Sequence, residues 1–256
     1  MSKVYLIGAG PGDPELLTVK ALRILQTADV VLHDSLIGPE IMKLIPASAE
    51  RVDVGKRRGF RLLNQQDINA LLLSNAAKHD IVVRLKGGDP LLFGRASEEI
   101  EMLRAAKIDF EVVPGISAAF GAASAAKVSL TDRRLASHVL FTTFSRAPEV
   151  QFLPSIGLNS ETTVVVYMPG PDYSEVSRWL IDAALAPETP ALVISKASHP
   201  DQSQQATTIA GLALLPTLPA PALLIVGRVT ASINDSTAAS RWLNEAVPEF
   251  QPSRVS

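Results

Sequence analysis

The sequence of 256 residues contains no cysteine. This absence excludes disulfides, thiolate metal sites and cysteine nucleophiles, and it gives no sign of an oxidising compartment. The chain also lacks a surplus of either charge, because 24 lysine and arginine residues are matched by 26 aspartate and glutamate residues. Since a dedicated nucleic-acid-binding protein normally carries a basic excess, we expect no nucleic-acid partner.

Long apolar runs are missing as well. The N-terminus has only a short run, Val4–Ile7, which is too short for a signal peptide. No stretch reaches the ~18 consecutive apolar residues that a membrane span requires. We therefore expect a cytoplasmic protein with no membrane partner. The apolar share of 47% is nevertheless enough for a substantial core and excludes intrinsic disorder.

Strand and helix patterns alternate in the first half of the chain. Short apolar runs predict strands, and stretches with apolar residues on one face predict helices between them. This alternation is typical of a mostly parallel sheet covered by helices, which indicates the α/β class. The expected strands are 4–7, 30–32, 51–54, 81–85 and 110–113, and the expected helices are 14–25 (capped by Asp13), 67–78, 96–106 and 117–126.

The pattern changes after residue 133. Short strands outnumber helices there, which favours a second α/β unit with a mixed sheet. We expect an N-terminal domain over 1–120, a C-terminal domain over 121–232, and a tail over 233–256 with one short helix around Trp242. The expected strands of the second domain are 139–143, 162–167, 191–194, 205–209 and 223–226, with one helix at 174–185.

A glycine-rich loop, Gly8–Asp13, follows the first strand and opens a helix. Glycines let the backbone approach a ligand closely, and a helix N-terminus offers free N–H groups. The spacing is not that of a dinucleotide-binding fingerprint, because Asp13 stands where the third glycine belongs. This disfavours an NAD-dependent oxidoreductase. A tight turn with a capped helix and no ligand stays open as an alternative.

A second loop, Gly87-Gly88-Asp89, follows the strand at 81–85. Ligands of α/β proteins bind outside the carboxyl ends of parallel strands, so two such loops in one domain indicate one binding crevice. Cations gather near these loops and suit a small polyanion, above all a polycarboxylate. Phosphate is the competing anion, and ordinary solvated side chains are the plain alternative. The cations are Lys56, Arg57, Arg58, Arg61, Lys86, Arg95, Arg133 and Arg134.

Metal and triad chemistry have little support in the sequence. The four histidines, at 33, 79, 138 and 199, include no i, i+4 pair, and no Gly-x-Ser-x-Gly elbow occurs. We therefore expect no metal site. His33 and His138 are more typical of core positions than of ligands. Asp34 ends a strand near the first glycine loop, where it acts either as a base or as a helix cap.

Several stretches resemble the tetrapyrrole methylase family. The most specific is Arg84-Leu85-Lys86-Gly87-Gly88-Asp89-Pro90 followed by Phe93-Gly94-Arg95 and Glu98-Glu99. Further similarity lies at 4–17, Asp34, 54–57 and 113–118, with sparser similarity at 164–168 and 221–227. The tail has no match.

The resemblance implies a two-domain fold with a mostly parallel N-terminal sheet, a mixed C-terminal sheet and the active site in the cleft between them. It implies a homodimer that uses S-adenosylmethionine (SAM) and no metal. The implied reaction is C-methylation of uroporphyrinogen III at C2 and C7 to give precorrin-2, on the branch to sirohaem, cobalamin or haem d1. A methylase of a later corrin precursor and a non-catalytic SAM- or tetrapyrrole-binding protein remain as alternatives.

The resemblance also assigns individual residues. A substrate with many carboxylates suits the cations above, and Asp89 suits a cationic sulfonium better than a pyrophosphate. As hypotheses, Arg95 holds a carboxylate or the macrocycle, and Asp34 helps to remove the proton released after methylation. Catalytic and substrate positions are Asp34, Lys56, Arg95, Glu98 and Arg133; donor-binding positions are Pro11, Gly87, Gly88, Asp89, Leu92, Ser117, Ala118, Met168 and Ala197.

The chain departs from the family pattern at a few positions. Asp132 and Ser145 stand where the family usually has histidine, and Phe144, Pro169 and Ala197 stand where it usually has glycine. Loss of the two imidazoles changes proton handling or substrate grip, and Phe144 fills space that glycine leaves open. These changes put the precise substrate in question and leave the expected SAM site intact.

Overall fold

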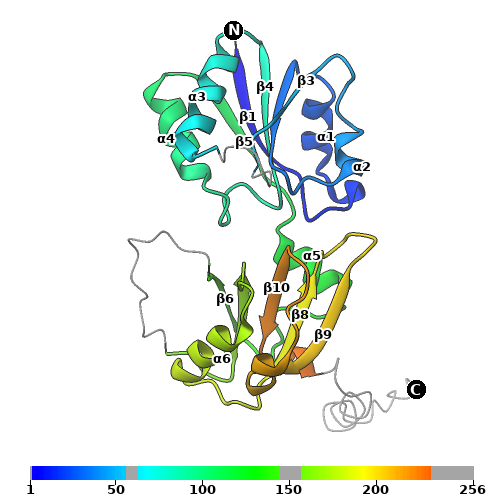
Figure 1. Ribbon diagram of the computed structural model, residues 1–256, viewed down its shortest axis with the longest axis vertical. Coiled ribbons are helices and arrows are strands. Elements are labelled where there is room, and N and C mark those ends of the chain that lie inside the picture. The colour runs from blue at the N-terminus through cyan, green and yellow to red at the C-terminus, as the bar shows by residue number, and fades with distance from the viewer. Residues whose placement is uncertain (1, 56–62, 145–156, 232–256) are drawn as a thin grey trace, which may run out of the picture. The chain divides into compact units, whose positions relative to one another are not determined.

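The computed structural model describes residues 2–55, 63–144 and 157–231. The chain forms two compact units (Figure 1). Unit 1 runs to Ala125 and also includes Lys196–Gln202, whereas unit 2 comprises Ala126–Ser195 and the residues from Ser203 onward. We had expected a boundary at residue 120, which falls inside helix α5 (Ala118–Ala125), and all of α5 belongs to unit 1. The expected tail, with its helix at Trp242, lies outside the described residues.

Unit 1 contains a five-stranded sheet in the order β3-β2-β4-β1-β5, in which every neighbouring pair is parallel. Because all strands point the same way, their carboxyl ends meet at one edge of the sheet, where α/β proteins bind ligands. Each strand begins and ends within one residue of its expected position. The strands are β1 (Lys3–Gly8), β2 (Val30–His33), β3 (Glu50–Asp53), β4 (Ile81–Lys86) and β5 (Asp109–Val113).

Helices cover both faces of this sheet (Figure 1). On one face α1 (Val19–Leu25) and α2 (Pro39–Met42) pack on Ile7 and Val31. On the other face α3 (Gln65–Ala76) and α4 (Ala96–Ala105) pack on Leu6. Successive strand residues point to opposite faces, so adjacent Leu6 and Ile7 serve two different cores. Fully burying such a side chain stabilises the fold by roughly 1.5–3 kcal/mol.

The first expected helix is two helices, and our expectation of one continuous helix over 14–25 was wrong. Asp13 caps only a short 3-10 helix, η1 (Pro14–Leu16), by accepting a hydrogen bond from the Glu15 N–H at 2.9 Å. The backbone of Thr18 is extended, and its hydroxyl accepts from the N–H of Ala21 at 3.1 Å to start α1. Threonine is itself a favoured N-cap, so α1 begins at Val19, five residues after the expected helix start at Pro14.

Unit 2 contains a second five-stranded sheet in the order β6-β7-β10-β8-β9. Only β6 and β7 pair in parallel, so the sheet is mixed, as expected. Helix α6 (Tyr173–Asp182) packs Val176 and Leu180 into the core of this unit. The strands are β6 (His138–Thr143), β7 (Thr162–Tyr167), β8 (Pro190–Ser195), β9 (Ser203–Thr208) and β10 (Ala222–Val226), and 3-10 helices η2 (Ala210–Leu214) and η3 (Arg228–Thr230) follow β9 and β10.

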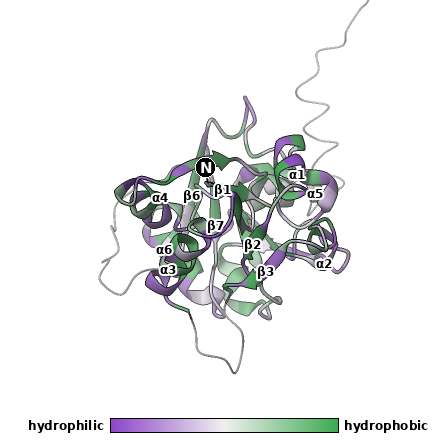
Figure 2. Cartoon of the chain, turned by 90° about the horizontal axis from the view of Figure 1, so that it is seen from above, coloured by the Kyte–Doolittle hydropathy of each residue, from purple (hydrophilic) through white to green (hydrophobic). Residues whose placement is uncertain are grey.

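The edge strand β3 differs in polarity from its neighbour β2. Figure 2 shows β2, with the sequence Val-Val-Leu-His, as hydrophobic, whereas β3, with the sequence Glu-Arg-Val-Asp, is mostly hydrophilic. Charged side chains on an edge strand discourage pairing with other chains. In the described part of the chain, no helix combines the length and apolar character needed to cross a membrane.

Candidate active site

The two glycine loops form one surface at the carboxyl ends of β1, β4 and β5. The N–H of Gly88 donates to the carbonyl of Gly10 at 2.8 Å, and the N–H of Gly10 donates back at 3.2 Å. A Cβ atom added to Gly8 would lie 2.6 Å from both Cα of Gly115 and the carbonyl oxygen of Gly88. One added to Gly115 would lie 2.3 Å from that same oxygen. Only glycine at positions 8 and 115 allows the backbones to approach so closely, and we call Gly8, Gly88 and Gly115 the glycine floor.

Asp89 joins two segments of this surface. One of its carboxylate oxygens accepts from the N–H of Leu91 at 2.8 Å, and the other accepts from the N–H of Gly115 at 3.0 Å. Both bonds are charge-assisted, so the position of this carboxylate is well defined. Beside it Gly87 is exposed, and an added Cβ atom there would meet nothing within 4 Å. The surface therefore combines a fixed negative charge with open space.

The other expected donor-binding residues of unit 1 lie around the same loops. An added Cβ atom on Gly88 would be 3.6 Å from the backbone nitrogen of Ala118, next to buried Ser117. Leu92 follows Asp89 and donates its N–H to the carbonyl of Asp89 at 3.3 Å. Pro11 lies against Gly121 of α5, where an added Cβ atom would come within 2.7 Å of its ring.

Ala197 belongs to the segment Lys196–Gln202, which is part of unit 1 although it lies between β8 and β9 in the sequence. Its neighbour Ser198 also approaches Gly121, and the ring of His199 lies against Gly12. An added Cβ atom on Gly12 would be 2.2 Å from Nε2 of that ring. The sequence assigns His199 no role, because spacing alone does not show that this distant segment lies on the first glycine loop.

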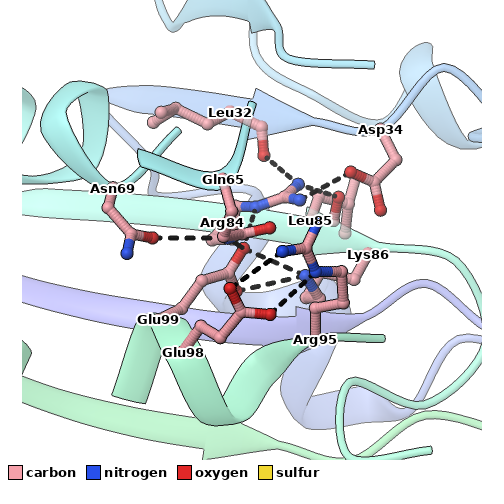
Figure 3. Close-up of polar contacts among 10 residues, drawn as sticks. All are labelled: Leu32, Asp34, Gln65, Asn69, Arg84, Leu85, Lys86, Arg95, Glu98 and Glu99. Atoms are coloured by element: carbon pink, nitrogen blue, oxygen red, sulfur yellow. Dashed lines mark hydrogen bonds and ion pairs between the residues drawn. The ribbon is translucent and has the colours of Figure 1, made fainter. Parts of the chain in front are cut away.

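Arg95 lies just before α4 and has a left-handed backbone, with φ 55°. Phe93 has φ 54°, so two non-glycine residues of this loop occupy a sparsely populated conformation, which often marks a functional site. The Arg95 guanidinium donates to both carboxylate oxygens of Glu98, at 2.7 and 2.8 Å (Figure 3). Hydrogen bonding to Glu98 raises the pKa of Arg95, so this exposed side chain keeps its charge and a defined orientation.

Lys86 is not part of a cationic rim, and our expectation for this residue was wrong. It ends β4 with only 3% exposure, and its ammonium lies 3.0 and 3.1 Å from the two carboxylate oxygens of Glu99. Glu99 is fully buried and also accepts from Nε of Arg84 at 3.0 Å. Burial, with a smaller contribution from the charge of Arg84, lowers the pKa of Lys86. The sequence names Arg84 and Glu99 only as part of the family motif and assigns neither a role, although a charge inside the apolar strand β4 was a signal.

Asp34 is hydrogen-bonded to Arg84, the same residue that binds Glu99. Its Oδ1 atom accepts from Nη2 of Arg84 at 2.6 Å, and its side chain is 31% exposed. It does not cap the following helix, because Gly38 occupies the N-cap of α2. Asp34 lines a cavity of about 670 Å³ together with His33, Ser35, Ile37, Pro39, Met42, Lys43, Arg51 and Asp53. Of the two roles expected for Asp34, base and helix cap, the capping role is excluded.

Two expected site residues belong to unit 2 and are described within it. Met168 directly follows β7, has φ 48°, and is 45% exposed. Arg133 is exposed in the turn before β6. The adjacent Asp132 accepts hydrogen bonds from the guanidinium and from the backbone N–H of Arg134, which lower the pKa of Asp132 to about 2. The carboxylate at this position therefore forms a local ion pair.

Five of the residues named from the sequence lie outside the described residues: Lys56, Arg57, Arg58, Arg61 and Ser145.

Two other expected features can be compared with the structure. Phe144 packs edge-to-face on Trp179 with ring centroids 5.6 Å apart, which directs its ring against the core of unit 2. His138 is exposed at the start of β6, so our assignment of it to the core was wrong. Across 2–55, 63–144 and 157–231, no group of three or more His, Asp or Glu side chains could hold a metal ion.

Comparison with known proteins supports a common ancestry over most of the chain. Residues 3–213 match the family described as tetrapyrrole (corrin/porphyrin) methylases. The chain is 46% identical to the uroporphyrinogen-III C-methyltransferase of Paracoccus denitrificans over 241 residues, covering 92% of this chain and 84% of that one. It is 44% identical to the siroheme synthase of Psychrobacter cryohalolentis, again over 92% of this chain, but it spans only about half the length of that relative.

The solved structures agree with the sequence comparison. Uroporphyrin-III C-methyl transferase from Thermus thermophilus, complexed with S-adenyl homocysteine, superposes with a TM-score of 0.78 at 35% identity. The superposition covers 90% of this chain and 94% of that structure. The fold of both units is therefore that of the family.

Proposed function

Because the chain belongs to the tetrapyrrole (corrin/porphyrin) methylase family, we propose that it is a SAM-dependent C-methyltransferase acting on uroporphyrinogen III. We further propose that it methylates C2 and C7 and releases precorrin-2. The chain spans about half the length of the siroheme synthase it resembles, and methyl transfer is the activity proposed for it. A homodimer is part of the same proposal.

The observation that carries the proposal is the glycine floor beside Asp89 and Gly87. Three backbones meet there without side chains, and the space next to Gly87 is open, so a ligand can lie directly on the main chain. SAM supplies a methyl group on a positively charged sulfur, and the Asp89 carboxylate supplies the opposite charge. The residues present therefore fit the donor. Ser117, Ala118, Pro11, Leu92 and Ala197 complete the proposed donor site in unit 1, and Met168 is proposed as a further contact.

Arg95 is the residue proposed to bind the substrate. Uroporphyrinogen III is rich in carboxylates, and an arginine guanidinium binds a carboxylate through paired hydrogen bonds. Glu98 occupies Nε and Nη2 of Arg95 and leaves the N–H groups of Nη1 for a ligand. Glu98 thus orients the guanidinium, while Lys56 and Arg133 are proposed as further substrate cations. Holding the acceptor carbon in line with the methyl group accounts for most of the acceleration.

Asp34 is the proposed proton acceptor. It stands at the carboxyl end of β2, lines the 670 Å³ cavity and presents a partly exposed carboxylate. The proton released after methylation moves to this carboxylate, which becomes a carboxylic acid and later returns the proton to solvent.

The direct test is to incubate the protein with uroporphyrinogen III and SAM labelled in its methyl group. We expect label in the tetrapyrrole, a product mass higher by two CH2 units because each added methyl group is accompanied by the loss of one proton, and the absorbance of precorrin-2 after the reaction. A reaction without tetrapyrrole controls for labelling of the protein. Absence of label contradicts the proposal, and labelling only of a later corrin precursor favours the alternative methylase. Stabilisation by NAD in place of SAM in a thermal-shift measurement contradicts the donor assignment.

A further inference from the structure

The first turn of α4 carries two adjacent carboxylates that bind different partners (Figure 3). Glu98 is partly exposed and pairs with Arg95. Glu99 is fully buried and pairs with Arg84 and Lys86 from β4. The proposed function uses Arg95 and Glu98, but it assigns nothing to the buried group.

Glu99 is held from several sides. Nε of Arg84 lies 3.0 Å from its Oε1 atom, and Nζ of Lys86 lies 3.0 Å from the same oxygen and 3.1 Å from the other. Nε2 of Gln65 on α3 adds a longer contact at 3.4 Å. A buried carboxylate is tolerated only when charges and donors satisfy it, so this arrangement is closely determined.

Arg84 connects the buried Glu99 to Asp34, which lines the cavity. Its side chain is 2% exposed, and its other end donates through Nη2 to Oδ1 of Asp34 at 2.6 Å. Nη1 donates to the carbonyl of Leu85 at 3.2 Å. Because the guanidinium is planar, fixing Nε against Glu99 also fixes the direction of Nη2. The orientation of Asp34 therefore depends on a buried residue of α4 that does not touch the cavity.

We propose that Glu99 and Arg84 are positioning residues that align the Asp34 carboxylate for proton removal. Arg84 holds Oδ1, which directs the remaining oxygen, Oδ2, to accept the proton. Lys86 neutralises the second negative charge of the cluster formed by Asp34, Arg84, Lys86 and Glu99. This inference rests on the proposed function, because it needs Asp34 to act as the proton acceptor.

The test is a double-mutant cycle on methyl transfer with Asp34→Asn, Glu99→Gln and both together. We expect Asp34→Asn to lower kcat by about 10²-fold. Glu99→Gln should lower kcat at least about tenfold, toward the roughly 10²-fold that a small misplacement costs. KM and the affinity for S-adenosylhomocysteine should change less than about threefold, since the glycine floor is untouched. The double variant should be no slower than Asp34→Asn, because Glu99 acts through Asp34.

Two further variants keep the test decisive. Glu101→Gln, on the exposed side of the same helix, should leave kcat unchanged. If Glu99→Gln does not fold, Glu99→Gln/Lys86→Met removes one charge of each sign and keeps the cluster balanced. This pair should fold and still show the lowered kcat, because Arg84 has lost its carboxylate.

The outcomes separate the inference from the function on which it depends. Normal kcat in Glu99→Gln or in the balanced pair, or multiplicative losses in the double variant, would overturn the positioning role. Normal kcat in Asp34→Asn contradicts the role of Asp34 as proton acceptor and the positioning role with it. No methyl transfer by the wild-type protein contradicts the proposed function itself.

Discussion

Two glycines of the same surface, Gly115 and Gly87, have opposite environments. An added Cβ atom on Gly115 would meet the Gly88 carbonyl oxygen at 2.3 Å and backbone atoms of Gly8 at 2.8 Å. The same atom on Gly87 would meet nothing within 4 Å. A methyl group added at Gly115 therefore tests the stability of the fold, whereas a methyl group added at Gly87 tests the binding of the ligand.

Gly115→Ala should lower the free energy of unfolding by at least ~2 kcal/mol, because backbone atoms cannot move aside as a flexible side chain would. Gly87→Ala should leave that free energy within about 0.5 kcal/mol of the wild type. It should nevertheless weaken binding of S-adenosylhomocysteine about tenfold or more, since the methyl group enters the proposed donor site. Urea unfolding and isothermal titration calorimetry measure the two quantities.

Gly157→Ala is the matched control, because an added Cβ atom there also meets nothing within 4 Å. It should change neither stability nor affinity. If Gly87→Ala binds S-adenosylhomocysteine as tightly as the control does, the donor does not lie on this loop.

Substitutions at the two ends of α4 distinguish the proposed role of Arg95 from a general effect on the helix. Arg95→Leu should lower kcat at least ~10²-fold, because the proposed grip on a substrate carboxylate is lost. Binding of S-adenosylhomocysteine should persist, since no backbone of the glycine floor changes. Arg104→Leu, which removes a guanidinium stacked on Phe110 at the other end of α4, is the control and should keep its activity. Full turnover by Arg95→Leu contradicts the assignment.

At the scale of elements, the sequence predicts the position of strand β4 correctly but the environment of its last residue, Lys86, incorrectly. Its position was predicted within one residue from its apolar run. Lys86 was nevertheless expected in a loop, because one residue at a strand end decides whether a side chain faces solvent or the core. Its burial depends on Glu99, whose contact with β4 is a tertiary contact that periodicity does not report.

The buried ammonium of Lys86 should give stability a specific pH dependence. Burial lowers its pKa below the usual value of 10.5, so near that value the unfolded chain binds more protons than the folded one. The free energy of unfolding therefore gains a contribution as pH rises from the folded-state pKa toward 10.5, and loses it as pH falls back through the folded-state pKa. Lys86→Met should lack this contribution.

The measurement is urea unfolding of the wild type and of Lys86→Met across the alkaline range. The difference in free energy of unfolding, wild type minus variant, should increase with pH over that window, since all other titrating groups are shared. A difference that is flat or that decreases with pH contradicts the lowered pKa.

At the scale of the whole molecule, the two kinds of sheet were predictable and the long-range contacts were not. Strand–helix alternation predicts a parallel sheet, and many short strands with few helices predict a mixed one. Nothing in the local pattern shows that Lys196–Gln202 joins unit 1, with His199 against Gly12. The resemblance had marked Ala197 alone in this segment, because family motifs identify single positions and not the packing around them.

The most direct measurement for the account is a crystal structure of the protein with S-adenosylhomocysteine. The account predicts the ligand on the backbone of Gly87 and Gly88, beside Asp89 and Ser117, with no movement of the glycine floor. A ligand bound elsewhere, with the space at Gly87 empty, would contradict it.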